Sequence, residues 1–76
     1  MKNMKKEKKI KAAILDILDT YNNIIGAVPI QMLHYHCIHH PTYGSNCTIQ
    51  EVTIQLNKLR LEGLVDVTKA YTKREK

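Results

Sequence analysis

Apolar residues recur at helical spacing near the start of the chain. The apolar positions are Ile10, Ala13, Ile14, Ile17, Leu18 and Tyr21. Spacings of three and four residues predict an amphipathic helix from about Lys5 to Tyr21, with one face turned to a core. We expect Asn22, Asn23 and Gly26 to end this helix, because these residue types are typical of turns.

A second, shorter helix is predicted at residues 30–39. Pro29 suits its first turn, where the missing backbone N–H costs nothing. Ile30, Leu33 and Cys37 share one face, and Cys37 is expected to lie in the core beside Leu33. Pro41 ends the helix, because the residue before a proline disfavours the helical conformation.

The strongest local pattern lies at residues 48–67. Thr48 and Glu51 have the spacing of a capping box, so each side chain can bind a free backbone N–H at a helix start. The buried stripe of this third helix is predicted to be Val52, Leu56 and Leu59. Gly63 stands where a left-handed C-terminal cap falls, which predicts a helix at residues 49–62.

Strand signals are short and lie mainly at the C-terminal end. Residues 64–68 and 70–73 predict a small hairpin that turns around Thr68 and Lys69, and Ala27–Val28 predicts a very short first strand. The chain is therefore expected to be mainly α with a small β component, in one domain.

The order helix, short strand, helix, helix, strand pair covers residues 10–73. It includes the motif Val52-Thr-x-x-Leu56-x-x-Leu59-x-x-x-Gly63-Leu-Val65. This motif resembles the third helix and wing of winged helix-turn-helix proteins such as MarR-like and ArsR-like repressors. The resemblance implies a three-helix winged helix-turn-helix with a C-terminal β-hairpin wing. A basic N-terminal arm at residues 1–9 would continue into the first helix, and a basic tail would follow at residues 74–76.

The resemblance further implies that the third helix enters the DNA major groove. The side opposite its apolar stripe carries groups that can bind base edges. The candidate base contacts are Gln50, Thr53, Ile54, Asn57 and Lys58. The candidate phosphate contacts are Tyr43, Thr48, Lys69, Lys73, Arg74, Lys5, Lys6 and Lys9. The partner would be double-stranded DNA, bound by a homodimer.

Charge is unevenly placed along the chain. Residues 1–11 carry a net charge of +5, residues 12–66 carry −3 and residues 67–76 carry +3. Basic ends commonly add affinity for nucleic-acid phosphate, but they also occur as solvated tails. A nonspecific nucleic-acid packaging protein that binds through both ends is therefore an alternative.

Two apolar residues complicate the expected DNA-reading face. Ile54 and Leu61 are seven residues apart, a spacing that suits helix-to-helix pairing. A protein-interaction module that uses this face is a second alternative. We favour instead the interpretation in which Leu61 packs under Tyr71 or the tail and Ile54 is a single exposed aliphatic side chain.

A cluster of histidines and two cysteines allows three further hypotheses. His36, His40 and Cys47 are candidate zinc ligands, although their spacing matches no established zinc motif, and we predict no metal site. Cys37 and Cys47 are a possible disulfide. The outward-facing His34 or His39 can meet DNA phosphate.

Several classes are excluded by what the chain does not contain. Isolated glycines, a single serine (Ser45) and scattered carboxylates indicate that the protein is not an enzyme, and no cofactor or small-molecule ligand is indicated. No apolar run approaches the roughly 20 residues of a membrane span. We expect a cytoplasmic regulator from a virus, plasmid or archaeon, in the host cytoplasm if viral.

Overall fold

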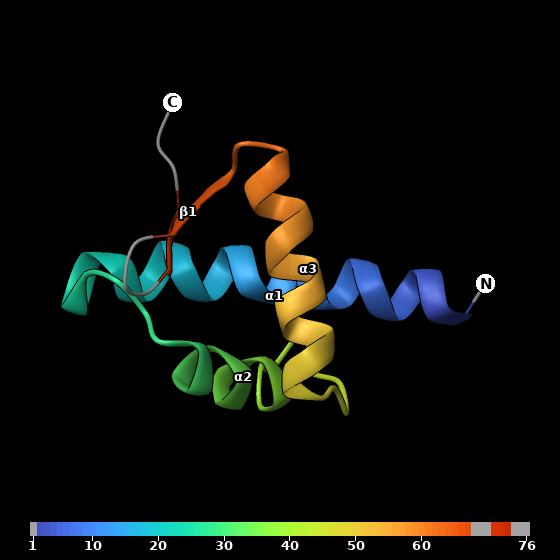
Figure 1. The fold of residues 1–76 in the computed structure, drawn as a ribbon. Coiled ribbons are helices and arrows are strands. Elements are labelled where there is room, and N and C mark those ends of the chain that lie inside the picture. Colours follow the sequence, from blue (N-terminus) through green and yellow to red (C-terminus); the bar gives the residue numbers. More distant parts are fainter. Residues whose placement is uncertain (1, 68–70, 74–76) are drawn as a thin grey trace.

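The computed structural model describes residues 2–67 and 71–73, with side chains from Lys6 to Asp66. This part of the chain is mainly helical. Its elements are α1 (Lys2–Ile25), α2 (Ile30–Ile38), α3 (Ile49–Leu61), β1 (Val65–Val67) and β2 (Tyr71–Lys73). Figure 1 shows α3 crossing the N-terminal half of α1, with α2 below α1 and level with the lower end of α3, and the N-terminal turns of α1 projecting past α3.

The first helix is longer at both ends than the pattern predicts. It continues through Asn22 and Asn23, so the prediction that these residues end it was wrong. Asn22 Nδ2 donates to the carbonyl of Gly26 at 2.6 Å, and Asn23 Nδ2 donates to the carbonyl of Asp19 at 2.9 Å. The helix stops where Gly26 takes a φ of 84°, a conformation that glycine adopts without strain.

The second helix begins and ends within one residue of its prediction. Pro29 is the N-cap rather than a residue of the first turn, and its carbonyl accepts the N–H of Leu33 at 3.0 Å. His39 is the C-cap, so the helix ends one residue earlier than predicted. Leu33 and Cys37 of the predicted face are buried, and Ile30 is partly buried against the core.

The third helix confirms its predicted caps. Thr48 Oγ1 accepts the Glu51 N–H at 3.1 Å, and the Glu51 carboxylate accepts the Thr48 N–H at 2.8 Å. At the other end, Gly63 has a φ of 82°, and the Leu64 N–H donates to the Leu59 carbonyl at 3.0 Å. These bonds cap both ends of the helix, and the glycine conformation sets the direction of the chain into β1.

The strands form the short antiparallel pair that the sequence predicts, with Val65 opposite Lys73 and Val67 opposite Tyr71. The predicted turn at Thr68 and Lys69 lies outside the described residues. Val28, in the predicted first strand, is fully buried and takes part in a single β-bridge.

One apolar core joins the three helices and β1. Its buried members are Ile10, Ala13, Ile14, Ile17, Leu18, Val28, Leu33, Cys37, Cys47, Val52, Leu56, Leu59 and Val65. Burial of each large aliphatic side chain contributes about 1.5–3 kcal/mol. The predicted stripes of the first and third helices are confirmed, although Tyr21 is only half-buried.

Candidate nucleic-acid interface

The structure places the five candidate base contacts on one side of α3, away from the core. Gln50, Ile54, Asn57 and Lys58 are exposed, and Thr53 is half-buried. The Thr53 hydroxyl donates to the Ile49 carbonyl at 2.8 Å. A base contact from Thr53 would therefore use its methyl group.

The same side of α3 carries two exposed aliphatic residues. Ile54 is 52% exposed and Leu61 is 82% exposed. The side chain of Tyr71 and the tail, under which Leu61 is predicted to pack, lie outside the side chains that the structure describes. Within the described part of the chain, both aliphatic side chains are exposed.

Ion pairs cross between the N-terminal half of α1 and one flank of α3. The pairs are Lys6 with Glu51 at 3.2 Å, Lys11 with Glu62 at 3.2 Å, and Lys58 with Glu7 at 3.9 Å. All are partly exposed, so each contributes at most about 1 kcal/mol, less than one buried core residue. Their main effect is on charge, because two candidate DNA contacts, Lys6 and Lys58, each face a carboxylate.

Glu51 links the start of α3 to α1. One carboxylate oxygen accepts the Thr48 N–H and the other faces Lys6. The Thr48 backbone hydrogen bond and then the Lys6 ammonium lower the pKa of this carboxyl below its usual range. Thr48 Oγ1 accepts the Glu51 N–H, so this candidate phosphate contact also acts as the helix cap.

The other candidate phosphate contacts are dispersed. Tyr43 lies in the connection between α2 and α3, is 37% exposed, and has its ring 5.1 Å from that of His40. Lys9 is exposed on α1. Lys69 and Arg74 lie outside the described residues. Lys5 lies in α1 and Lys73 in β2, and neither side chain is among those that the structure describes.

His40 organises the connection between α2 and α3, a role that the sequence pattern did not reveal. Its Nδ1 accepts the backbone N–H groups of Thr42 and Tyr43, each at 3.0 Å. Because Nδ1 is an acceptor, Nε2 carries the proton that is donated to Asp16 Oδ2 at 2.6 Å. The hydrogen bonds to Thr42, Tyr43 and Asp16 thus hold the His40 ring in one tautomer, with the proton on Nε2.

The candidate zinc ligands His36, His40 and Cys47 are not arranged as a metal site. His36 stacks on Tyr21 with ring centroids 4.6 Å apart, and His40 lies beyond the end of α2. Within the described residues, no three His, Cys, Asp or Glu side chains are arranged to hold a metal ion. His34 is half-buried and donates from Nε2 to the Cys47 carbonyl at 2.8 Å. The expectation of an outward-facing His34 was therefore wrong, whereas His39 is exposed.

Cys37 and Cys47 are both buried, and both are free thiols. Burial, with a smaller contribution from Cys47, raises the pKa of the Cys37 thiol to about 12. Burial also raises the pKa of Cys47. Both side chains therefore act as small apolar groups of the core at neutral pH.

Gln55 is a buried polar residue that sequence reasoning missed. It is 3% exposed, and its Oε1 has no hydrogen-bond partner within the described part of the chain. Gln55 lies between Leu56 and the polar side of α3, a position that is compatible with either a buried or an exposed side chain. Only the placement of the N-terminal part of α1 beside α3 decides the outcome.

Comparison with protein-family models, with curated proteins and with solved structures finds no match for this chain. None of the helices in residues 2–67 has the length and apolar character needed to cross a membrane.

Proposed function

We propose that this chain is a non-enzymatic, sequence-specific DNA-binding regulator of the winged helix-turn-helix type, acting as a homodimer. Helix α3 would enter the major groove, and the β1–β2 pair and the basic ends would lie against phosphates. The observation that supports this proposal best is the exposed side of α3, where Gln50, Asn57 and Lys58 lie together.

The geometry of α3 suits this role. Thirteen residues make a rod about 20 Å long, and the B-DNA major groove, about 12 Å wide, admits an α-helix. Gln50 and Asn57 can pair bidentately with adenine, Lys58 can reach guanine, and Ile54 can contact a thymine methyl group. Both ends of the helix are capped, so its reading side is held rigidly before DNA is bound.

Affinity for phosphate would come from the ends of the chain rather than from the side of α3. Lys6 and Lys58 face carboxylates of the same chain, which reduces the positive charge beside the helix. We therefore expect binding to duplexes of arbitrary sequence to be weak at physiological salt. Base contacts would then provide the discrimination between sequences.

The exposure of Leu61 and Ile54 favours a second candidate function. A protein-interaction module would use these two side chains to bind a partner helix. Such a protein would bind DNA poorly even at low salt, and Ile54→Lys would abolish its association. In the DNA-binding proposal, Ile54→Lys changes sequence preference instead.

The test is binding-site selection from a randomised duplex library at physiological salt, with wild type, Asn57→Ala and Asn23→Ala. We expect wild type and Asn23→Ala to enrich the same inverted repeat, with half-sites about one helical turn apart. Asn57→Ala should relax the preference at one position of each half-site. Retention of DNA without any enriched sequence would contradict the proposal and favour packaging. Retention of no DNA would favour the protein-interaction module.

A further inference from the structure

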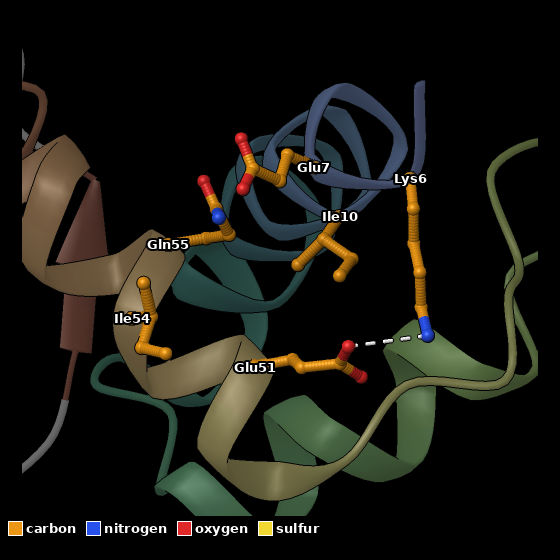
Figure 2. A pocket seen from close by; sticks show the side chains of 6 residues that line it. All are labelled: Lys6, Glu7, Ile10, Glu51, Ile54 and Gln55. Atoms are coloured by element: carbon orange, nitrogen blue, oxygen red, sulfur yellow. Dashed lines mark ion pairs between the residues drawn. The ribbon is translucent and has the colours of Figure 1, made fainter. Parts of the chain in front are cut away.

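A groove lies between the N-terminal part of α1 and the side of α3. Its volume is about 280 Å³. Figure 2 shows the six side chains that line it: Lys6, Glu7, Ile10, Glu51, Ile54 and Gln55. Ile10 and Ile54 provide apolar surface, and the other four side chains provide charge and hydrogen-bonding groups. A mixture of apolar surface and a few convergent polar groups is typical of a small-molecule site.

Gln55 supplies the first indication of a ligand. A buried side-chain acceptor without a partner is uncommon, because leaving it unpaired is unfavourable. Gln55 Oε1 has no partner in the described part of the chain, and the side chain lines the groove. Oε1 is itself buried, so a ligand reaches it only when the amide turns about its last side-chain bond, which is soft for an amide. A ligand that carries an N–H donor would satisfy it.

The carboxylates around the groove favour a ligand that donates hydrogen bonds. Glu7 and Glu51 line the groove together with the ammonium of Lys6. Glu51 is already engaged, because its two oxygens face Thr48 N–H and Lys6. Glu7 forms an ion pair with Lys58 at 3.9 Å, which is too far for a hydrogen bond. Glu7 therefore keeps acceptor capacity for the N–H groups of a ligand.

Glu7 and Gln55 lie on the same side of the groove, reaching toward each other from α1 and α3 (Figure 2). The Lys6–Glu51 pair closes the other side, and Ile10 lies between. We propose that the groove binds a small organic cation, with its ammonium group between Glu7 and Gln55 and its short apolar chain over Ile10 and Ile54.

A regulatory consequence rests on the proposed DNA-binding function. Ile54 and Lys6 line the groove and are also candidate DNA contacts, so a bound cation and a DNA duplex would share two side chains. The two ligands would then weaken each other's binding by the same factor. The cation would act as an effector that releases DNA.

The test is a titration of the protein, without DNA, with n-butylammonium chloride. Binding is monitored in ¹H–¹⁵N correlation spectra. We expect saturable shifts confined to the groove residues, with dissociation in the millimolar range expected for so small a ligand. Sodium butyrate and n-butanol should cause no saturable shift, since they lack the cation. Because DNA is absent, failure to bind duplex DNA in a separate assay would leave this result intact.

Variants identify the contacts. Glu7→Gln and Gln55→Met should each weaken n-butylammonium binding at least tenfold. Glu62→Gln is the matched control, because it removes a carboxylate of another α1–α3 ion pair outside the groove, and it should bind as wild type does. The proposal is overturned if butyrate binds as well as n-butylammonium, if no saturable shift appears, or if Glu7→Gln and Gln55→Met both bind as wild type does. In the presence of a selected duplex, n-butylammonium should lower DNA affinity in wild type and not in Glu7→Gln.

Discussion

Replacing Gln55 by methionine should stabilise the protein. Gln55 is 3% exposed and its Oε1 has no hydrogen-bond partner in the described part of the chain. An unsatisfied buried polar group costs about 1–3 kcal/mol, whereas a methionine of similar length and shape carries no such group. We therefore expect Gln55→Met to raise the free energy of unfolding by about 1 kcal/mol. In a domain of this size that gain corresponds to a rise in Tm of roughly 4–8 °C.

The assay is reversible thermal and urea unfolding, followed by far-ultraviolet circular dichroism. Gln50→Met is the matched control, because Gln50 lies on the exposed side of the same helix. Its free energy of unfolding should change by no more than about 0.5 kcal/mol. A fall in Tm for Gln55→Met would refute the reasoning, because it would mean that the amide makes a hydrogen bond whose loss outweighs the removed cost. The gain in stability would accompany the loss of cation binding, an exchange that is common at binding sites.

Four further predictions concern the connection between α2 and α3 and its surroundings. Gly44→Ala should destabilise the protein by at least about 2 kcal/mol in urea unfolding, since a Cβ there would collide with two backbone carbonyl oxygens; wild-type stability would contradict the close approach. His40→Ala should cost about 1–2 kcal/mol because two backbone N–H groups lose their acceptor, whereas the exposed His39→Ala should be neutral. The folded-state pKa of Glu51 is lowered. The stabilising effect of this carboxylate is therefore present above the unfolded-state pKa and is lost as pH falls through the folded-state pKa. Glu51→Gln should flatten the loss of stability on acidification, and an unchanged pH profile would refute this. Cys37, with its pKa raised to about 12, should resist alkylation at neutral pH until the protein unfolds, as mass spectrometry would show; rapid alkylation of native protein would refute its burial.

Local signals accounted for the parts of the fold that the sequence predicted well. The capping box at Thr48 and Glu51 and the glycine stop at Gly63 are contained within a few residues, so the limits of α3 were predicted within one residue. The apolar stripes of the first and third helices were likewise predicted, because helical spacing alone determines which side chains share a face. The short strand pair was predicted from the strand-favouring residues that come directly after Gly63.

Features that depend on contacts between distant segments were not predictable in the same way. The N-terminal part of α1 lies beside α3, where Lys6 pairs with Glu51 and where Glu7 and Gln55 line one groove. No periodicity in either segment indicates how they cross. Leu61 is 82% exposed, and the residues predicted to cover it, Tyr71 and the tail, lie outside the described side chains.

The candidate site was predicted in part. Helical angle identified the exposed side of α3, and the structure places Gln50, Ile54, Asn57 and Lys58 there. The angle could not reveal that Lys58 faces Glu7, a residue of α1 that is far away in the sequence.

The most direct measurement of the central claim is a ¹H–¹⁵N titration of the protein with the duplex enriched by binding-site selection. If α3 reads DNA, the amide shifts should concentrate at Gln50, Ile54, Asn57 and Lys58 and should vanish with a scrambled duplex at physiological salt. Shifts confined to the lysine-rich start of α1, equal for both duplexes, would contradict the claim that α3 enters the major groove.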